Sequence, residues 1–305
     1  MTPRTRRARP ARAAGAPRSP LARVALETTL LVHGVPRAHA PALARDLALA
    51  VHKAGGLPML IGVVAGQVRV GMNDADLKTM LSARDVPKLN TASIGAAIHQ
   101  RSHGATTVST TMELAAGAGI RLFATGGLGG VHREFAKRLD ISADLAAFVR
   151  FPVAVVTSGC KSILDVASTR EALETLGVPV IGYRTDRFPA FYQREGDAGV
   201  DARFDDPADL AAFIHSELSR TGRGMVICNP IPKQDEINRR DWDRWLAAAG
   251  TRFAVRTAEG RDATPALLAA LHQVSKGRTL KANIALALNN ADLAGRLASH
   301  LASPR

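Results

Sequence analysis

The chain has 305 residues, of which 46% are hydrophobic and 4% aromatic, and its mean hydropathy is +0.00. This composition is typical of a globular protein with an aliphatic core, and the scarcity of aromatic residues argues against a stacking surface for single-stranded nucleic acid. The formal net charge is +13, and no run of 18 apolar residues occurs, so we expect no membrane-spanning helix.

The positive charge is concentrated at the amino terminus. Residues 1–23 hold seven arginines and no acidic residue, so the rest of the chain carries the remaining +6 of the total +13. A segment rich in Arg, Ala and Pro buries too little apolar surface to fold, so we expect residues 1–22 to be a disordered tail. A transit peptide is the alternative. We do not expect nucleic acid as the partner, because charge on a flexible tail creates no specific site.

The amino-terminal half of the chain shows strand and helix signals. Residues 24–32 form an apolar run that is typical of a strand and is interrupted by Glu27-Thr28-Thr29. Apolar residues at helical spacing predict a helix over 40–54, which Gly55-Gly56 ends. The other expected elements are a hairpin of strands 58–64 and 67–72, and helices 74–81, 92–99 and 110–118.

The carboxy-terminal half continues this alternation and ends in helices. The expected elements are strands 121–124, 153–156, 178–182 and 225–228, and helices 163–176, 236–249, 265–275 and 280–301. Strands that alternate with helices indicate an α/β fold in which helices cover a mixed or parallel sheet. No linker-like stretch divides residues 23–302, so we expect a single domain there.

Lys161 is the most informative residue of the sequence. The β-branched run 153–156 ends in the small-residue turn Thr157-Ser158-Gly159, and Lys161 follows where a helix is expected to begin. Ligand sites of α/β proteins gather at this end of the strands. An amine held among apolar groups becomes neutral more easily and can attack a carbonyl carbon to form a Schiff base.

The chain has two cysteines, Cys160 and Cys228, and no CxxC pair. They form no disulfide framework, so we expect a reducing, cytoplasmic location. Although Cys160 precedes Lys161, we expect it to be a small buried residue rather than a nucleophile.

Acidic residues at two places in the sequence suggest catalytic or metal-binding roles. Glu27 is a lone carboxylate in an apolar run, where it is either a buried general acid with a raised pKa or a carboxylate that faces solvent. Asp140 and Asp144 are four residues apart with Ser142 between them. On a helix they would share a face and suit Mg²⁺ or Mn²⁺, whereas the alternative is that one of them caps a helix over 143–149. No HExxH motif occurs, so we do not expect a zinc site.

Three further segments are polar or rich in glycine. The stretch 126–130 lacks the GxGxxG and P-loop patterns and predicts a tight turn, with an anion-binding loop between Thr125 and His132 as the alternative. Residues 104–112 hold five hydroxyl side chains, which either cap a helix or form a polar wall for a sugar or phosphate. Asn283 and Asn290 share a face of the expected last helix, and a ligand is one candidate partner for their amides.

Taken together, these motifs resemble one family, the pseudouridine-5′-phosphate glycosidases, also called the indigoidine synthase A family. The resemblance covers residues 22–301 and rests on many motifs in the family's order. They are Ala25-Leu26-Glu27 with His33-Gly34, and residues 104–108, 123–133, 140–145, 159–165, 182–186, 188–191, 229–232 and 283–286.

The resemblance implies a three-layer α/β/α sandwich, a homotrimer, and one Mn²⁺ or other divalent cation per subunit. The implied reaction is the reversible cleavage of pseudouridine 5′-phosphate to uracil and ribose 5-phosphate through a lysine Schiff base. Matched position by position, Lys161 is the nucleophile, Glu27 the proton donor and Asp140 the metal ligand. The implied substrate contacts are Lys88, Val108, Ser142, Ala143, Asp144 and, in less certain roles, Thr125, His132 and Asn289.

The sequence departs from the family pattern after Lys88. Many members have arginines there, whereas this chain reads Leu89-Asn90-Thr91-Ala92-Ser93. If those arginines hold phosphate or shape the mouth of the site, substrate preference differs here. The alternative function is therefore the same lysine–iminium chemistry on another sugar phosphate or C-nucleotide.

Overall fold

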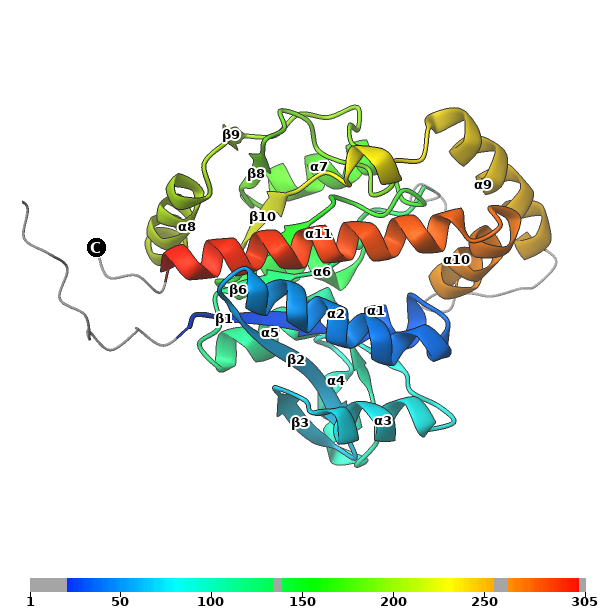
Figure 1. Ribbon diagram of the computed structural model, residues 1–305, viewed down its shortest axis with the longest axis horizontal. Coiled ribbons are helices and arrows are strands. Elements are labelled where there is room, and N and C mark those ends of the chain that lie inside the picture. Colours follow the sequence, from blue (N-terminus) through cyan, green and yellow to red (C-terminus); the bar gives the residue numbers. More distant parts are fainter. Residues whose placement is uncertain (1–20, 134–138, 255–262, 302–305) are drawn as a thin grey trace, which may run out of the picture.

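The computed structural model describes residues 21–133, 139–254 and 263–301. The predicted tail, residues 1–22, lies outside this part of the chain except for its last two residues. Eight strands of the described residues form one sheet in the order β3-β2-β1-β6-β7-β10-β8-β9 (Figure 1). The strands are β1 Arg23–Glu27, β2 Leu57–Val64, β3 Gln67–Val70, β6 Leu122–Ala124, β7 Ala154–Thr157, β8 Val180–Tyr183, β9 Ala202–Phe204 and β10 Met225–Cys228.

The sheet is largely parallel, as predicted. Only the pairing of β3 with β2 is antiparallel in the described sheet. The carboxyl ends of the parallel strands therefore meet at one edge, where α/β proteins bind ligands. β1 is central: Leu26 lies beside Leu60 of β2 on one side and beside Ala124 of β6 on the other.

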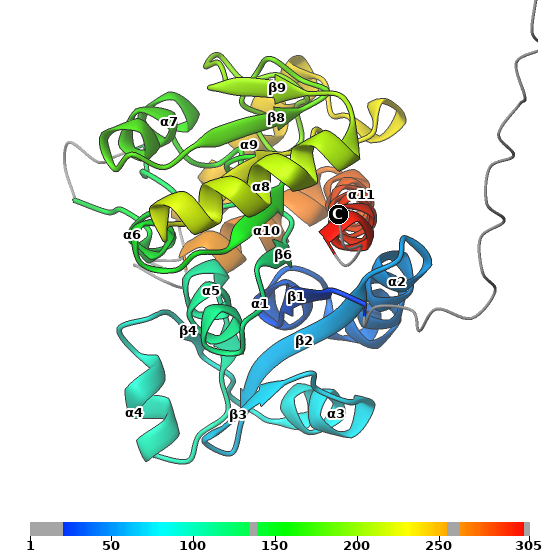
Figure 2. The same cartoon turned by 90° about the vertical axis from the view of Figure 1, so that its left-hand side faces the viewer.

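Helices cover both faces of the sheet, which makes three layers and confirms the expected sandwich. Helices α2, α8 and α11 lie on one face, and α5, α6 and α7 on the other (Figure 2). The helices longer than one turn are α1 Thr29–His33, α2 Ala40–Lys53, α3 Asp74–Ser82, α4 Ile94–His99, α5 Val108–Gly117, α6 Ala143–Arg150, α7 Val166–Thr175, α8 Pro207–Thr221, α9 Arg239–Ala254, α10 Ala263–Val274 and α11 Arg278–Leu301.

The alternation of side chains along the strands divides the core into two parts. Val24 and Leu26 point toward α2 and α11, whereas Ala25 between them joins the core beneath α5. The helix α11 approaches α2 closely at Gly295, where a Cβ atom would overlap the carbonyl oxygen of Val51. This contact fixes the height at which α11 crosses the strands, and with it the position of the asparagines of α11.

A smaller unit extends the sheet beyond β2. It consists of β3, α3, α4 and a separate parallel pair, β4 Lys88–Leu89 and β5 Ala105–Thr106. The sequence analysis did not predict β4 or β5, because two-residue strands show no periodicity. The pairing of Lys88 with Ala105 carries the lysine toward the end of β1.

Two boundaries differ from the predictions. The expected strand 24–32 is wrong in its second half: β1 ends at Glu27, and Thr29–His33 is the helix α1, whose first turn closes by Val32 N donating to Thr28 O at 2.9 Å. A short apolar run does not distinguish strand from helix. The helix expected from residue 163 begins at Val166. Its N-cap is Asp165, whose side chain accepts a hydrogen bond from Ser168 N at 2.9 Å.

The sequence analysis also missed α8, although its signals are present. Asp206 accepts hydrogen bonds from the backbone of Ala208 and Asp209, Pro207 occupies the first turn, and Gly222 ends the helix with φ +65°. These are standard start and stop residues of a helix. The strand β9, only three residues long, was missed as well.

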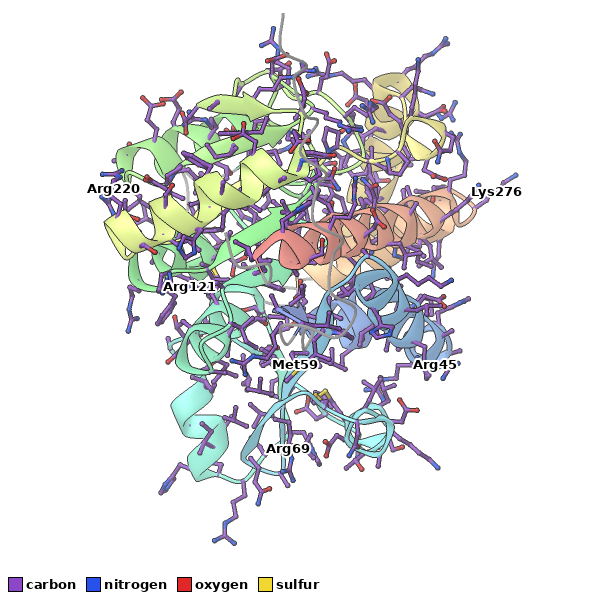
Figure 3. The ribbon with its side chains drawn as sticks, turned by 60° about the vertical axis from the view of Figure 1, so that its left-hand side comes forward. Arg45, Met59, Arg69, Arg121, Arg220 and Lys276 are labelled. Carbon is purple, nitrogen blue, oxygen red and sulfur yellow. The ribbon has the colours of Figure 1, made fainter. Side chains whose placement is uncertain are left out.

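The positive charge of the folded body is dispersed. Figure 3 shows Arg45, Arg69, Arg121, Arg220 and Lys276 pointing outward from separate elements, and all five are exposed. Within the described ranges, no helix combines the length and apolar character needed to cross a membrane.

Candidate active site

The predicted catalytic residues meet at the carboxyl edge of the sheet. Glu27 is the last residue of β1, Thr125 follows β6, and Lys161 is the fourth residue after β7. A cavity of about 290 Å³ opens there, which we call the outer cavity. Its lining includes these predicted site residues: Glu27, Lys88, Val108, His132, Asp140, Ser142, Ala143, Asp144 and Lys161.

Glu27 is a buried carboxyl group that is partly protonated near neutral pH. Its side chain accepts a hydrogen bond from Thr125 Oγ1. Burial raises the pKa of Glu27 from 4.5 to about 7, and the nearby Lys161, the Thr125 hydrogen bond and Lys88 counteract part of this rise. Asp144 raises the pKa further. A carboxyl group in this range can give or take a proton, as a general acid must.

A network of threonines fixes the strand end that carries Glu27. Thr28 Oγ1 donates to Ile61 O at 3.0 Å and accepts from Thr106 N at 2.9 Å. Thr111 Oγ1 donates to Thr106 Oγ1 at 3.0 Å. The hydroxyl-rich stretch therefore ties three elements together, and its interpretation as a helix cap is wrong, since the N-cap Thr107 makes no side-chain capping bond.

Lys161 lies in the loop between β7 and α7, at the wall of the outer cavity. Lys161 N donates to Leu128 O at 3.1 Å, which attaches this loop to the glycine-rich loop after β6. Gly159 has φ +79°, and a Cβ atom there would overlap the carbonyl oxygen of Pro189. Cys160 is buried, and burial raises its pKa to about 12, so its thiol is not poised as a nucleophile.

The glycine-rich loop packs closely against its neighbours. A Cβ atom would overlap the Phe191 ring at Gly127, the side chains of Ser142 and Asp144 at Gly129, and Thr169 at Gly130. Leu128 N donates to Gly159 O at 2.9 Å, and Val131 N to Thr169 Oγ1 at 3.0 Å. Close approach of backbone to side chain therefore accounts for these glycines, as the tight-turn prediction expected.

Asp144 organises the site rather than forming a helix face with Asp140. Asp144 Oδ1 accepts from Ser109 N and Oδ2 from Gly129 N, both at 2.9 Å. Because α6 begins at Ala143, Asp140 precedes the helix, and the predicted i,i+4 pair on one face is wrong. The alternative, an aspartate cap, is wrong as well, because Ser142 is the N-cap and its side chain accepts from Asp144 N at 3.2 Å.

The residues around Asp140 offer few ligands for a metal ion. Its carboxylate is 48% exposed at the cavity wall, and its Oδ2 lies 3.6 Å from His132 Nδ1. Among the described residues, no three His, Cys, Asp or Glu side chains form a metal-binding group. This donor set fits a hard cation that keeps several waters and binds phosphate oxygens, as Mg²⁺ and Mn²⁺ do, and does not fit a cation enclosed by protein ligands.

A second, smaller cavity continues inward from the outer one. This inner cavity, of about 50 Å³, shares Glu27, Thr29, Lys88 and Lys161 with the outer cavity and reaches Asn283 of α11. Asn283 Oδ1 and Thr29 Oγ1 are buried and have no hydrogen-bond partner within the described part of the chain. Unsatisfied buried polar atoms are costly, which marks this cavity as a place for a polar ligand.

The asparagines of α11 have different surroundings: Asn283 lines the inner cavity, whereas Asn289 and Asn290 bond to other segments of the protein. Asn283 Nδ2 donates to Gly34 O at 3.1 Å, and its Oδ1 has no hydrogen-bond partner among the described residues. Asn290 Nδ2 donates to Thr125 O at 2.8 Å and Oδ1 accepts from Asn229 Nδ2 at 3.0 Å. Asn289, an expected substrate contact, donates to Pro230 O at 3.1 Å and lines neither cavity. The sequence analysis named Asn283 for its place on the helix face, but not as a site residue.

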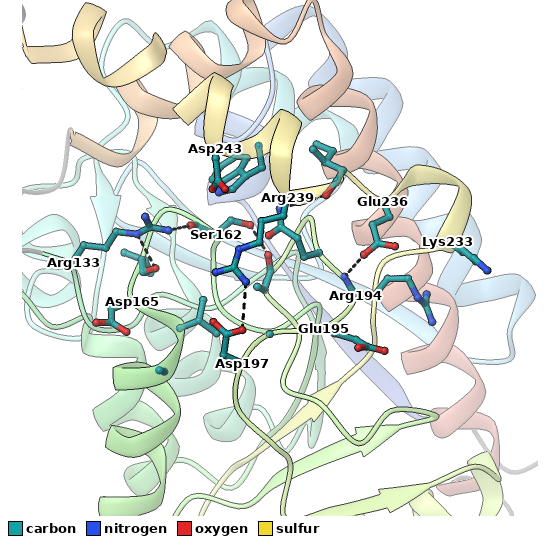
Figure 4. A pocket seen from close by; sticks show the side chains of 18 residues that line it. Arg133, Ser162, Asp165, Arg194, Glu195, Asp197, Lys233, Glu236, Arg239 and Asp243 are labelled. Carbon is teal, nitrogen blue, oxygen red and sulfur yellow. Dashed lines mark hydrogen bonds and ion pairs between the residues drawn. The ribbon is translucent and has the colours of Figure 1, made fainter. Parts of the chain in front are cut away.

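A third cavity, of about 880 Å³, is lined by Ser162 and Asp165 of the loop that carries Lys161, together with residues of other segments (Figure 4). We call it the side cavity. It shares only Leu164 with the outer cavity, and none of the predicted catalytic residues lines it. Arg133 contacts the loop from the side cavity, donating to Ser162 O at 2.9 Å and to Leu164 O at 3.3 Å. Arg133 therefore holds the loop from the side cavity, whereas Glu27 and Lys161 line the two smaller cavities.

Comparison with known proteins identifies the family. The sequence model of the family described as indigoidine synthase A like protein matches residues 12–300. The chain belongs to this family. Pseudouridine-5′-phosphate glycosidase of Methylobacterium nodulans is 44% identical over 283 residues, which are 92% of this chain and 84% of that protein. The protein of the same name from Solibacter usitatus is 45% identical and covers 91% of this chain and 93% of its own length.

Solved structures of the family have the same fold. An indigoidine synthase A-like protein of Thermotoga maritima is 34% identical, with a TM-score of 0.85, over 93% of this chain and 94% of that chain. The prealnumycin C-glycosynthase AlnA, in complex with ribulose 5-phosphate, is 36% identical, with a TM-score of 0.83, over 92% of each chain.

Proposed function

We propose that this protein is a pseudouridine-5′-phosphate glycosidase, which reversibly cleaves the carbon–carbon bond between uracil and ribose 5-phosphate. The observation that carries the proposal is Glu27, a buried carboxyl group with a pKa of about 7, facing the same cavity as Lys161. Relatives 44–45% identical to this chain bear that name.

The chemistry explains why an amine and a carboxylic acid are needed together. The base is attached through carbon, so no nitrogen lone pair helps it to leave. The ε-amine of Lys161, reacting in its unprotonated form, displaces the ring oxygen at C1′, and the ring oxygen takes a proton from the amine to become the 4′-hydroxyl. The lone pair left on nitrogen then forms the C=N double bond while the bond to the base breaks. The electrons of that bond go to the base carbon, which takes the proton of Glu27. Water releases the sugar from Lys161 as ribose 5-phosphate.

The two cavities suit the two halves of the substrate. In this arrangement ribose 5-phosphate occupies the outer cavity, with its phosphate near Asp140, His132 and the start of α6 at Ser142. Backbone N–H groups at a helix start favour an anion. The base occupies the inner cavity, where Asn283 Oδ1 accepts from a ring N–H and Thr29 supplies a hydroxyl.

The metal and the assembly are part of the proposal. Asp140, with His132 nearby, would hold Mn²⁺ or another divalent cation, which would neutralise phosphate charge when bound. We expect Asp140→Ala to weaken metal binding, as measured by calorimetry with Mn²⁺ alone.

We also infer a homotrimer in the cytoplasm from the family resemblance, and light scattering would test a mass three times that of the 32.2 kDa chain.

Uracil release tests the function directly. The purified protein, loaded with Mn²⁺, should release uracil from pseudouridine 5′-phosphate, and borohydride should trap a ribose 5-phosphate adduct on Lys161. Lys161→Ala should abolish both while leaving the circular dichroism spectrum unchanged. Absence of uracil release by the unmodified protein, with an active relative as positive control, would refute the proposal.

Two observations support a second candidate, the same lysine chemistry on another sugar phosphate. A C-glycosynthase that binds ribulose 5-phosphate has the same fold. In addition, Asn90, in the segment that departs from the family pattern, lines the outer cavity beside Lys88. Trapping Lys161 with ribulose 5-phosphate in preference to ribose 5-phosphate would favour this candidate.

A further inference from the structure

We propose that Phe191 determines specificity for a planar base, because its ring forms a stacking wall of the inner cavity. This inference rests on the proposed function and names the residue that recognises the leaving group. Phe191 lines the inner cavity together with Glu27 and Lys161 and is 4% exposed.

The backbone of Phe191 is strained where it enters a two-residue turn that the Ala190–Gln193 pair closes. Its φ is +62°, in the left-handed region that bulky residues avoid. Among the described residues, the other non-glycine residues with positive φ are Ala65, Arg101, Arg184 and Lys276, and all of these are exposed. Phe191 is the buried exception, and strained residues of this kind gather at binding and catalytic sites.

The surroundings of the ring prepare it to receive a ligand. The ring lies against the backbone of Gly126 and Gly127, and a side chain at Gly127 would overlap it. Tyr192 supports it from another side, with ring centroids 4.6 Å apart. Gly126 and Gly127 line the inner cavity together with Phe191, so the ring has fixed neighbours at the place where we expect the base.

The position of Phe191 is coupled to that of Lys161. Phe191 N donates to Ser158 O at 2.9 Å, and Ala190 pairs with Gly159. Ser158 Oγ in turn donates to Asn229 O at 3.0 Å. The loop that carries the amine therefore also places the ring, so that a base on the ring lies within reach of both reacting groups.

The ligand chemistry follows from the groups around the ring. An aromatic face, an unpaired amide oxygen of Asn283 and an unpaired hydroxyl of Thr29 suit a flat heterocycle with N–H donors. Aromatic side chains bind nucleobases by stacking, and removal of the ring weakens binding by about 5- to 150-fold. A sugar phosphate alone needs no such wall.

Because the proposed reaction is reversible, the binding of ribose 5-phosphate and the binding of uracil can be measured separately. Phe191→Leu keeps an apolar side chain but removes the ring. We expect borohydride trapping of Lys161 with ribose 5-phosphate to stay within about twofold of the unmodified protein. The KM for uracil, in condensation with ribose 5-phosphate, should rise by about 5- to 150-fold.

Two further variants keep the test decisive. Tyr192→Phe is the matched control, because Tyr192 is an adjacent buried aromatic residue that does not line either ligand cavity, and it should leave the KM for uracil unchanged. Phe191→Gly removes the ring and relieves the positive φ, so it provides the same measurement if the leucine variant does not fold.

Each outcome decides the question. An unchanged KM for uracil in Phe191→Leu, or an equal loss of sugar trapping and condensation, would overturn the inference. So would a matching KM increase in Tyr192→Phe, since it would show a general packing effect. If the unmodified protein forms no ribose 5-phosphate adduct, the proposed function fails first and the inference fails with it.

Discussion

Glu27 illustrates a conflict between stability and function at the scale of one residue. The unfolded chain leaves this carboxyl group in water, where it ionises at its ordinary pKa of 4.5, whereas burial in the fold raises the pKa to about 7. The folded protein therefore binds more protons than the unfolded chain between these pH values. Its stability must fall as pH rises from 4.5 to about 7, because the unfolded state is then favoured by ionisation.

Glu27→Gln should accordingly stabilise the protein while it abolishes turnover. The neutral amide avoids a burial cost that corresponds to on the order of 3 kcal/mol for a pKa shift of this size. The gain in unfolding free energy should be absent below pH 4.5 and complete above about pH 7, as measured by urea unfolding across this range. A gain that does not vary with pH would contradict this assignment. Uracil release should fall by about 10²- to 10⁴-fold.

Thr125 should set the pH at which cleavage stops. Cleavage needs the protonated form of Glu27, so kcat/KM for uracil release should decline as pH rises through about 7. The Thr125 hydroxyl lowers the pKa of Glu27, and Thr125→Val should therefore move this decline to higher pH. The profile of Thr111→Val, which removes a buried hydroxyl bonded to Thr106 instead, should keep its midpoint. A Thr125→Val profile displaced to lower pH would show that another group titrates.

At the scale of elements, the loops after β6 and β7 form one unit. Leu128 N donates to Gly159 O at 2.9 Å, Lys161 N donates to Leu128 O at 3.1 Å, and Asp144 holds the glycine loop from α6. Hydrogen bonds between loops limit their motion, and the amine is positioned by several segments at once. The precision of the site therefore depends on turns that local sequence alone does not specify.

Gly159→Ala should disturb this unit severely. The position combines φ +79° with a carbonyl oxygen, Pro189 O, where the Cβ atom would lie. We expect the free energy of unfolding to fall by about 2–4 kcal/mol. We also expect kcat to fall by a larger factor than the fraction of folded protein does. Gly222→Ala is the matched control: its φ is +65° but nothing lies within 4 Å of the added atom, so it should cost about 1 kcal/mol. Equal losses in the two variants would exclude the overlap as the cause.

At the scale of the whole molecule, the parallel sheet assembles the site from distant segments. Glu27, Thr125 and Lys161 follow three adjacent strands, and α11 adds Asn283 from the end of the chain. Among the residues that the structure describes, those that line the two ligand cavities all lie between Glu27 and Asn283.

Removal of residues 1–20 should therefore leave catalysis intact. We expect kcat/KM for uracil release to stay within about twofold, and any salt-sensitive binding of DNA to disappear with the arginines. A gel-shift titration at two salt concentrations, alongside the uracil assay, would measure both effects. A large loss of uracil release in the shortened chain would show that the segment contributes to the catalytic body.

The sequence predicted most of the sheet and the pair of residues, Glu27 and Lys161, that the fold brings to one cavity, for a physical reason. Strands such as Ala154–Thr157 are short, apolar and β-branched, and helices such as Ala40–Lys53 have regular apolar spacing, so both are visible locally. It did not predict β4, β5 or the change from strand to helix after Glu27. These depend on pairing with distant residues and on a short run that fits either structure.

By itself, the sequence determined the α/β class, the position of Lys161 after the end of a strand, and the glycines that a tight loop requires. Tertiary structure alone decided which asparagine of α11 lines the inner cavity, that Asp140 lies outside the helix that holds Asp144, and that Phe191 has a positive φ in the cavity that Lys161 also lines. The spacing of residues along one helix or strand determines which of its side chains share a face. The packing of different elements at the carboxyl ends of the strands determines which side chains come together in the site.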